Sequence, residues 1–185
     1  CDSRPKDEPE IPFVLEGISP ENYPKTDAST SAEPLQTLIA CKLLDFRYDW
    51  RRREYLDGVF FIYPNYEDVP EGMLSRFSST GTHTAFMNLI NKEVDFIITA
   101  RKASEDELTE AKQKGVELIE TQIALDAFVF ITHLDNRVKA LTTEQIQRIY
   151  TGEIKNWKEV GGKDRLINPY TRNINSGSQE LMESL

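Results

Sequence analysis

The chain has 185 residues, enough for one ordinary domain or two small ones, and its 39% hydrophobic and 29% charged residues exclude an intrinsically disordered protein. No apolar run approaches the roughly 20 residues that a membrane-spanning helix needs, so the sequence predicts no transmembrane segment. The net charge of −9 argues against a general nucleic-acid binder, but a local cluster of arginine and backbone N–H groups could still bind a small anion.

The first residue is a cysteine, and the segment after it is rich in proline and acidic residues. Cys1 with such a polar tail resembles the start of a mature bacterial lipoprotein, in which the cysteine carries the lipid and the tail is a tether. The alternative is a chain boundary that falls at a cysteine by chance. We expect residues 1–22 to form a flexible tether, with Cys1 as the lipidation site and residues 11–15 docking as an edge segment.

Small hydroxyl residues precede the first predicted helix. The segment Ser29–Ser31 is typical of a helix N-cap, and Pro34 fits the first turn of a helix that extends to about Leu44. Cys41 lies in an apolar run of this helix, where we expect a small buried side chain rather than a disulfide with Cys1. The turn Ser29–Ser31 is the first candidate for binding an anion.

An arginine- and aromatic-rich stretch follows at residues 46–54. It would suit a protein or nucleic-acid partner, but its carboxylates break up the positive field, and we favour a solvated helix end with aromatic packing. Residues 58–63 form an apolar, β-prone run that predicts a strand, and residues 64–72 predict a loop.

A second small-residue turn lies at residues 78–82 and runs into a predicted helix with apolar positions at helical spacing. Residues 94–99 predict a short buried strand that ends next to Arg101, and the carboxyl ends of strands are where α/β proteins bind ligands. Ser104 is an N-cap signal followed by acidic residues, so we predict a helix from there to about Lys114, which Gly115 ends.

The remaining chain alternates between predicted strands and helices. Strands are predicted at residues 116–120, 123–132 and 166–170. A helix begins after Thr142, and Trp157 marks a packed turn. This order predicts an α/β fold with mostly parallel strand pairing.

A third small-residue turn, Ser176–Ser178, follows Arg172 at the start of the last predicted helix. The unpaired N–H groups of that helix start would point at a bound anion. The alternative is an ordinary turn with an N-cap. Three such turns, each at the start of a helix, together with arginines at two strand ends, would surround one tetrahedral oxyanion with hydrogen-bond donors.

With these turns in place, the chain resembles the phosphate-binding periplasmic proteins of ABC transporters, the PstS-like branch of the type II solute-binding fold. The resemblance runs from about Tyr23 to Leu185. Its most specific stretches are residues 27–35, 123–130 and 141–157, with residues 160–162 and 172–178 beyond. The most diagnostic of them reads LTTEQIQRIYTGEIKNW.

The resemblance implies two α/β lobes that close on a dehydrated phosphate. Residues 23–124 would form the first lobe, and residues 125–185 the hinge strand and part of the second lobe, which we expect to be incomplete. Unpaired strands there would favour a homodimer. The implied ligand-binding residues are Ser29, Thr30, Ser31, Thr82, His83 and Arg101 in the first lobe and Arg172, Ser176, Gly177 and Ser178 in the second. For His83, a capping or surface role stays open.

Two positions depart from the family's pattern. Family members carry an aspartate that accepts the proton of hydrogen phosphate, and the matching residue here is Ala100. The aspartate that braces the second-lobe arginine is matched by Ile174. Without the acceptor, rejection of sulfate should weaken. We therefore expect anion binding with relaxed discrimination between phosphate and sulfate or another oxyanion.

The function that the resemblance implies is capture of phosphate, or a similar oxyanion, by an extracytoplasmic, lipid-anchored solute-binding protein that serves an ABC permease. No cofactor, metal or nucleic-acid partner is expected. An enzyme is disfavoured because His83 and His133 show no nucleophile-and-acid arrangement and no metal-ligand spacing appears. The alternative is a lipid-anchored surface sensor or adhesion protein that has the same fold but no longer serves transport.

Overall fold

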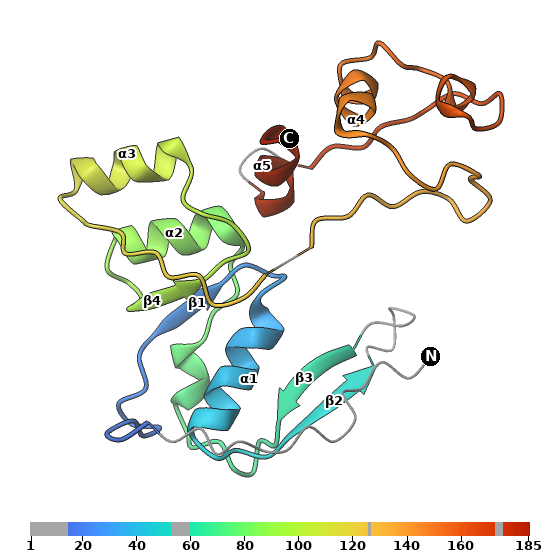
Figure 1. Ribbon diagram of the computed structural model, residues 1–185. Coiled ribbons are helices and arrows are strands. Elements are labelled where there is room, and N and C mark those ends of the chain that lie inside the picture. The colour runs from blue at the N-terminus through green and yellow to red at the C-terminus, as the bar shows by residue number, and fades with distance from the viewer. Residues whose placement is uncertain (1–14, 53–59, 126, 173–175) are drawn as a thin grey trace. The chain divides into compact units, whose positions relative to one another are not determined.

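The computed structural model describes residues 15–52, 60–125, 127–172 and 176–185 of the chain (Figure 1). Cys1, most of the predicted tether and Ile174 lie outside the described residues. The chain divides into two compact units, Cys1–Glu120 and Thr121–Leu185, which we call unit 1 and unit 2 and describe separately. None of the described helices is long and apolar enough to span a membrane.

Unit 1 contains a parallel pair of short strands, β1 (Thr26–Ala28) and β4 (Phe96–Ile98). All three residues of β1 are buried, and β4 confirms the short strand predicted within residues 94–99. The contact continues beyond the strands, where the Ser29 N–H donates to the Ile98 carbonyl at 3.0 Å. Parallel strands need a long crossover connection, and helices lie within this one.

Three helices of unit 1 lie close to their predicted positions: α1 (Glu33–Leu43), α2 (Thr82–Ile90) and α3 (Glu105–Gln113). Pro34 lies in the first turn of α1, as predicted. The N-cap of α1 is Ala32, which makes no side-chain capping bond, so the predicted capping by the preceding hydroxyl residues is wrong. In contrast, α3 begins with the capping box of Ser104 and Glu107 that its sequence predicts.

Residues 46–54, which we predicted as a helix end, instead contribute a strand. β2 (Tyr48–Arg52) pairs antiparallel with β3 (Phe60–Pro64), which confirms the β-prone run. Exposure alternates along Tyr48–Arg51, and Trp50 lies opposite the buried Ile62. The period of two in this stretch suits a strand and outweighs the expected helical continuation.

A buried cluster of Tyr23, Ala40 and Met73 supports α1 and the short helix η1 (Met73–Arg76). Ile18, at the end of the predicted tether, packs against this cluster. Cys41 is a buried free thiol, as its apolar helical context predicts.

Unit 2 contains α4 (Thr143–Tyr150), the short helix η2 (Trp157–Val160) and α5 (Gly177–Glu183). Thr142 and Gln145 form a capping box at the start of α4, as expected for the diagnostic sequence stretch. Gly162 packs so closely on Trp157 that an added Cβ would lie 2.9 Å from the tryptophan Cβ.

The strands predicted at 116–120, 123–132 and 166–170 are not formed in the described residues; Leu166 makes only an isolated bridge to Asn156. Their apolar side chains are largely exposed, for example 91% for Ile131. The physical reason is that a strand needs a partner backbone, which apolar alternation by itself does not supply. Even so, the described part is mixed α/β with a parallel pair, the predicted fold class.

Candidate functional site

Three segments of unit 1 meet at the carboxyl end of the β1–β4 pair. Ser29–Ser31 follows β1, and Thr99–Arg101 follows β4. The turn before α2 lies beside β1, because the Ala28 N–H donates to the Ser78 carbonyl at 3.1 Å and the Gly81 N–H to the Ala28 carbonyl at 3.4 Å. The structure therefore brings two of the predicted anion turns and Arg101 to one strand end, where α/β proteins bind ligands.

Asp27, in the middle of β1, ties the second turn to this strand end. Its buried carboxylate accepts four hydrogen bonds, from the Ala28 N–H at 2.8 Å, the Thr80 N–H at 3.0 Å, the Thr80 hydroxyl at 2.6 Å and the Asn88 amide at 2.7 Å. Burial alone would raise the pKa of Asp27, but the hydrogen bonds from Thr80, Asn88 and Ala28 outweigh it and lower the pKa below the ordinary value of 3.8. Asp27 is thus a charged internal anchor.

The first turn has one buried and two exposed residues. Ser29 is buried, and its carbonyl accepts the N–H groups of Ala32 at 2.9 Å and Glu33 at 3.1 Å. Thr30 and Ser31 are exposed, and the Ser31 hydroxyl lies 3.2 Å from that of Ser29. The turn therefore holds its own backbone and leaves the Thr30 and Ser31 side chains accessible.

The second turn depends on a glycine. Gly81, the N-cap of α2, has φ of 94° and ψ of 160°, a conformation that residues with a Cβ rarely adopt. Thr82, the first residue of α2, is buried at 7% exposure. The Ser79 hydroxyl oxygen is also buried and has no hydrogen-bond partner among the described residues. A buried hydroxyl without a partner costs stability, so Ser79 is a candidate donor to a ligand.

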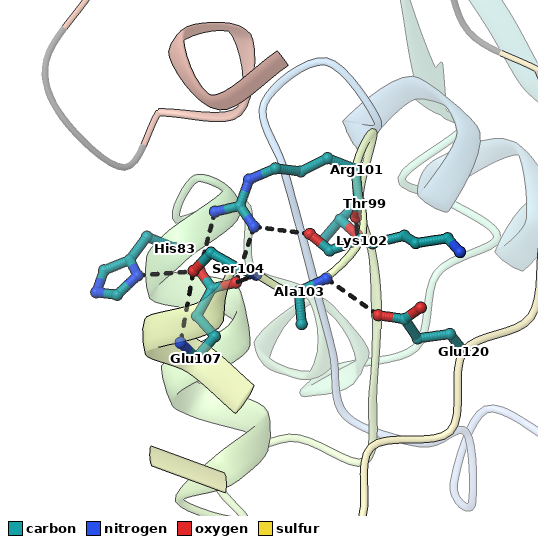
Figure 2. A network of polar contacts seen from close by, with 8 residues as sticks. All are labelled: His83, Thr99, Arg101, Lys102, Ala103, Ser104, Glu107 and Glu120. Carbon is teal, nitrogen blue, oxygen red and sulfur yellow. Dashed lines mark hydrogen bonds and ion pairs between the residues drawn. The ribbon is translucent and has the colours of Figure 1, made fainter. Parts of the chain in front are cut away.

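Arg101 is buried, with 5% of its side chain exposed, and forms a bidentate ion pair with the completely buried Glu107 (Figure 2). The Nη1–Oε2 distance is 2.8 Å and the Nη2–Oε1 distance is 2.9 Å. Nη1 also donates to the Lys102 carbonyl at 2.8 Å, and the guanidinium carbon lies 5.4 Å from the centre of the Phe86 ring. The guanidinium is therefore fixed on several sides, yet its Nε is buried and unpaired within the described part of the chain.

Glu107 also joins Arg101 to His83. Its Oε1 lies 3.0 Å from His83 Nδ1, and its Oε2 accepts the Ser104 N–H at 2.8 Å. Burial alone would raise the pKa of Glu107, but the hydrogen bonds from Arg101, Ser104 and His83 and the charge of Arg101 hold the pKa below the ordinary value of 4.5. Glu107 is therefore ionised at neutral pH, and His83 Nδ1 acts as the donor.

The third predicted turn is folded in unit 2. Ser176 is the N-cap of α5, and its hydroxyl accepts the Gln179 N–H at 3.2 Å. The buried Gln179 side chain accepts the Arg172 N–H at 2.9 Å, which brings Arg172 next to the helix start. Arg172 is exposed, while Gly177 and Ser178 are half-buried.

Donors dominate the strand end of unit 1. Hydroxyl groups and the Arg101 N–H groups lie there, while the two buried carboxylates, Asp27 and Glu107, each already accept four hydrogen bonds. Such an arrangement suits an oxyanion, which needs several donors at once. Within the residues that the structure describes, no group of three His, Cys, Asp or Glu side chains could hold a metal ion.

Three polar residues of this region were not predicted as site residues: Ser79, Asp27 and Glu107. The spacing from Ser104 to Glu107 is a capping-box signal, and it could have identified Glu107 as more than an acidic first-turn residue. Asp27 and Ser79 carry no comparable local signal, because their partners or their burial depend on segments distant in the sequence.

A family model described as "PBP superfamily domain" matches residues 56–185. The phosphate-binding protein PstS of Borreliella burgdorferi is 31% identical over 120 residues, covering 65% of this chain and 41% of that protein. The phosphate-binding protein PstS of Staphylococcus epidermidis is 33% identical over 106 residues, covering 56% of this chain and 33% of that protein.

A solved structure is similar in fold. It is a crystal structure of a putative phosphate ABC transporter substrate-binding protein with bound phosphate from Clostridium perfringens, with a TM-score of 0.58 and 26% sequence identity. The match covers 90% of this chain and 54% of that one. The chain thus spans about a third to two fifths of the length of these curated relatives and about half of the solved structure.

Proposed function

The chain belongs to the PBP superfamily domain family and is PstS-like, and from this membership we propose that it captures phosphate, or a similar oxyanion, as a solute-binding protein. The observation that carries the proposal is the unpaired, buried Nε of Arg101 at the strand end where two hydroxyl-rich turns meet. A buried N–H without an acceptor is costly, and an oxyanion would supply the acceptor.

Binding in this proposal replaces the water around the anion with protein donors. Thr30, Ser31, Thr82 and Arg101 would donate from unit 1, together with Ser79, which the structure adds to the candidates. The residues proposed from unit 2 are Arg172, Ser176, Gly177 and Ser178. No bond is made or broken, so the protein acts by binding and release rather than as an enzyme.

The cellular role is a further part of the proposal. Relatives are named as phosphate-binding proteins, and the solved structure is titled as a substrate-binding protein of an ABC transporter. By analogy, we propose that this protein acts outside the cytoplasm and hands its ligand to an ABC permease. Cys1 would anchor it to the membrane through a lipid, which mass spectrometry of the protein extracted from its native membrane would detect.

A thermal-shift titration with phosphate, sulfate and an organic phosphate tests the binding proposal. Ligand at a hundredfold excess over Kd stabilises a protein by about 2.7 kcal/mol. For a chain of this size, that corresponds to a rise in Tm of roughly 5–10 °C. Arg101→Lys should reduce the rise, whereas the matched control Arg51→Lys, in the exposed part of β2, should keep it.

Sulfate should raise the Tm nearly as much as phosphate does. Ala100 offers no carboxylate, and the buried carboxylates of Asp27 and Glu107 already accept from internal donors, so none of these three positions supplies a free carboxylate for the proton of hydrogen phosphate. A response to phosphate alone would contradict this relaxed selectivity, and no response to any of the anions would contradict the binding proposal itself.

A further inference from the structure

The ion pair of Arg101 and Glu107 leaves one edge of the buried guanidinium without an acceptor among the described residues. A guanidinium has five N–H groups, one on Nε and two on each Nη. Glu107 accepts one from each Nη, and the Lys102 carbonyl accepts the second from Nη1. The two remaining N–H groups, on Nε and on Nη2, are not used by any described residue.

These two N–H groups form a pair of parallel donors, which we call the fork of Arg101. By the naming of arginine atoms, Nη1 lies on the side of Cδ, so Nη2 lies on the same side as the Nε–H. The Nε–H and the second N–H of Nη2 therefore point in parallel from one edge of the plane. Two parallel N–H groups of arginine match two oxygens of a carboxylate, phosphate or sulfate.

Protein contacts occupy the other sides of the Arg101 guanidinium, so the edge formed by Nε and Nη2 is the one left for a ligand. The ring of Phe86 lies 5.4 Å from the guanidinium carbon, and the Thr99 hydroxyl donates to the Arg101 carbonyl at 2.8 Å, which fixes the backbone. Glu107 occupies the end of the guanidinium (Figure 2). With the end and the Cδ side occupied, rotation about the side-chain torsions cannot present a different pair of donors without breaking the ion pair.

Glu107 is itself held in place. It accepts from His83 Nδ1 and the Ser104 N–H in addition to the two bonds from Arg101. A buried ion pair adds little net stability compared with an apolar pair of the same shape, because both charges lose their hydration. A role in fixing the arginine explains this arrangement better than stability does.

We propose that Glu107 is a positioning residue that directs the Nε–Nη2 edge of Arg101 at the bound oxyanion without touching the anion. The inference rests on the proposed function, since it concerns the same site. Without the Glu107 carboxylate, the guanidinium would turn toward other acceptors, and the fork would no longer be preformed. The affinity for the anion should therefore fall, although a negative charge has been removed from the site.

The sign of the change in anion affinity distinguishes a positioning role of Glu107 from a purely electrostatic one. If Glu107 acted on the anion only through its charge, removing that charge would tighten anion binding. If it positions Arg101, Glu107→Gln should weaken phosphate binding about tenfold or more, the effect of losing one hydrogen bond to a charged group. Glu105→Gln is the matched control, because it removes an exposed carboxylate from the first turn of the same helix, and it should leave the affinity unchanged.

A double-mutant cycle shows whether Glu107 acts through Arg101. Calorimetric titration of phosphate would compare the unaltered chain with Glu107→Gln, Arg101→Lys and the double variant. We expect Glu107→Gln to cost little further affinity once Arg101 is replaced. Equal losses in both backgrounds, or a Glu107→Gln chain that binds as tightly as the unaltered one or more tightly, would overturn the inference. Absence of binding in the unaltered chain would overturn the proposed function as well.

One measurement needs no change at Glu107 and therefore does not depend on the folding of that variant. The Arg101 Nε–H signal in a ¹H–¹⁵N spectrum is assigned by its loss in Arg101→Lys. In the unaltered chain this signal should shift on saturation with phosphate, because an oxygen accepts from it. Binding of phosphate with the signal unmoved would show that the anion does not use this edge.

Discussion

Asp27 is the residue whose replacement tests the described site most severely. Its carboxylate connects β1 to the turn before α2 through Thr80 and to α2 itself through Asn88. Asp27→Asn keeps the shape of the side chain but removes its charge. One acceptor oxygen remains, and an NH₂ group now faces donors that previously had an acceptor.

The magnitude follows from the four donors. The amide oxygen can keep the two backbone N–H donors of Ala28 and Thr80, and the Thr80 hydroxyl can rotate to accept from the new NH₂ group, so the Asn88 amide is the donor that loses its acceptor. Each buried donor left unpaired costs about 1–3 kcal/mol. We therefore expect a loss of about 1–3 kcal/mol, which is a measurable part of the roughly 5–15 kcal/mol that stabilises a typical folded protein.

Urea unfolding followed by circular dichroism measures this loss. The matched control is Asp45→Asn, the same chemical change at an exposed position whose φ of 55° asparagine also tolerates. The control should change stability by less than about 0.5 kcal/mol. A loss no greater for Asp27→Asn than for the control would refute the reasoning that buried donors depend on this carboxylate.

The pH dependence of the same pair of proteins gives an independent check. Because the pKa of Asp27 is lowered in the folded chain, its ionised form contributes stability that is fully present above its unfolded pKa and lost as pH falls through the folded pKa. The stability difference between the unaltered chain and Asp27→Asn should be constant from about pH 5 to 8 and shrink below about pH 4. A difference that stays constant down to pH 2 would contradict this assignment.

Two further predictions concern packing. Burial raises the pKa of the Cys41 thiol to about 11, so the neutral thiol contributes stability that is fully present below its ordinary pKa of 9.0 and lost as pH rises toward 11. In a Cys1→Ser chain, Cys41 should therefore react with a thiol reagent at pH 8 only after unfolding by urea, and fast reaction in the folded chain would contradict its burial. In unit 2, Gly162→Ala would bring a Cβ to 2.9 Å from the Trp157 carbonyl and 3.0 Å from Val138. We expect a loss of about 1–3 kcal/mol, visible as a lower Tm, whereas Gly161→Ala would meet no atom within 4 Å and test only the left-handed backbone.

Local signals in the sequence predicted most helix starts correctly. The capping boxes at Ser104 and Thr142 depend on residues three positions apart, so the sequence contains nearly all the information that fixes them. Pro34 and Gly115 similarly mark a helix start and a helix end. The turns at Ser29–Ser31 and at Gly81 were recognised for the same reason, since small residues mark tight turns directly.

Contacts between distant segments were much harder to predict. Residues 123–132 have strand-like composition, but a strand forms only against a partner, and the described residues provide none. Tyr48–Arg52 is a strand because it pairs with Phe60–Pro64. Its own sequence does not show this pairing, so the sequence predicts a helix end there. The donors that Asp27 receives from Thr80 and Asn88, and that Glu107 receives from Arg101 and His83, come from other segments of the chain, so local sequence patterns do not reveal them.

Isothermal titration calorimetry of phosphate into the unaltered chain tests anion capture at Arg101 most directly. We predict one phosphate bound per chain and, in Arg101→Lys, an affinity lower by about tenfold or more, since a bidentate pair of N–H groups is lost. No heat of binding in the unaltered chain, or equal affinity in Arg101→Lys, would contradict the account.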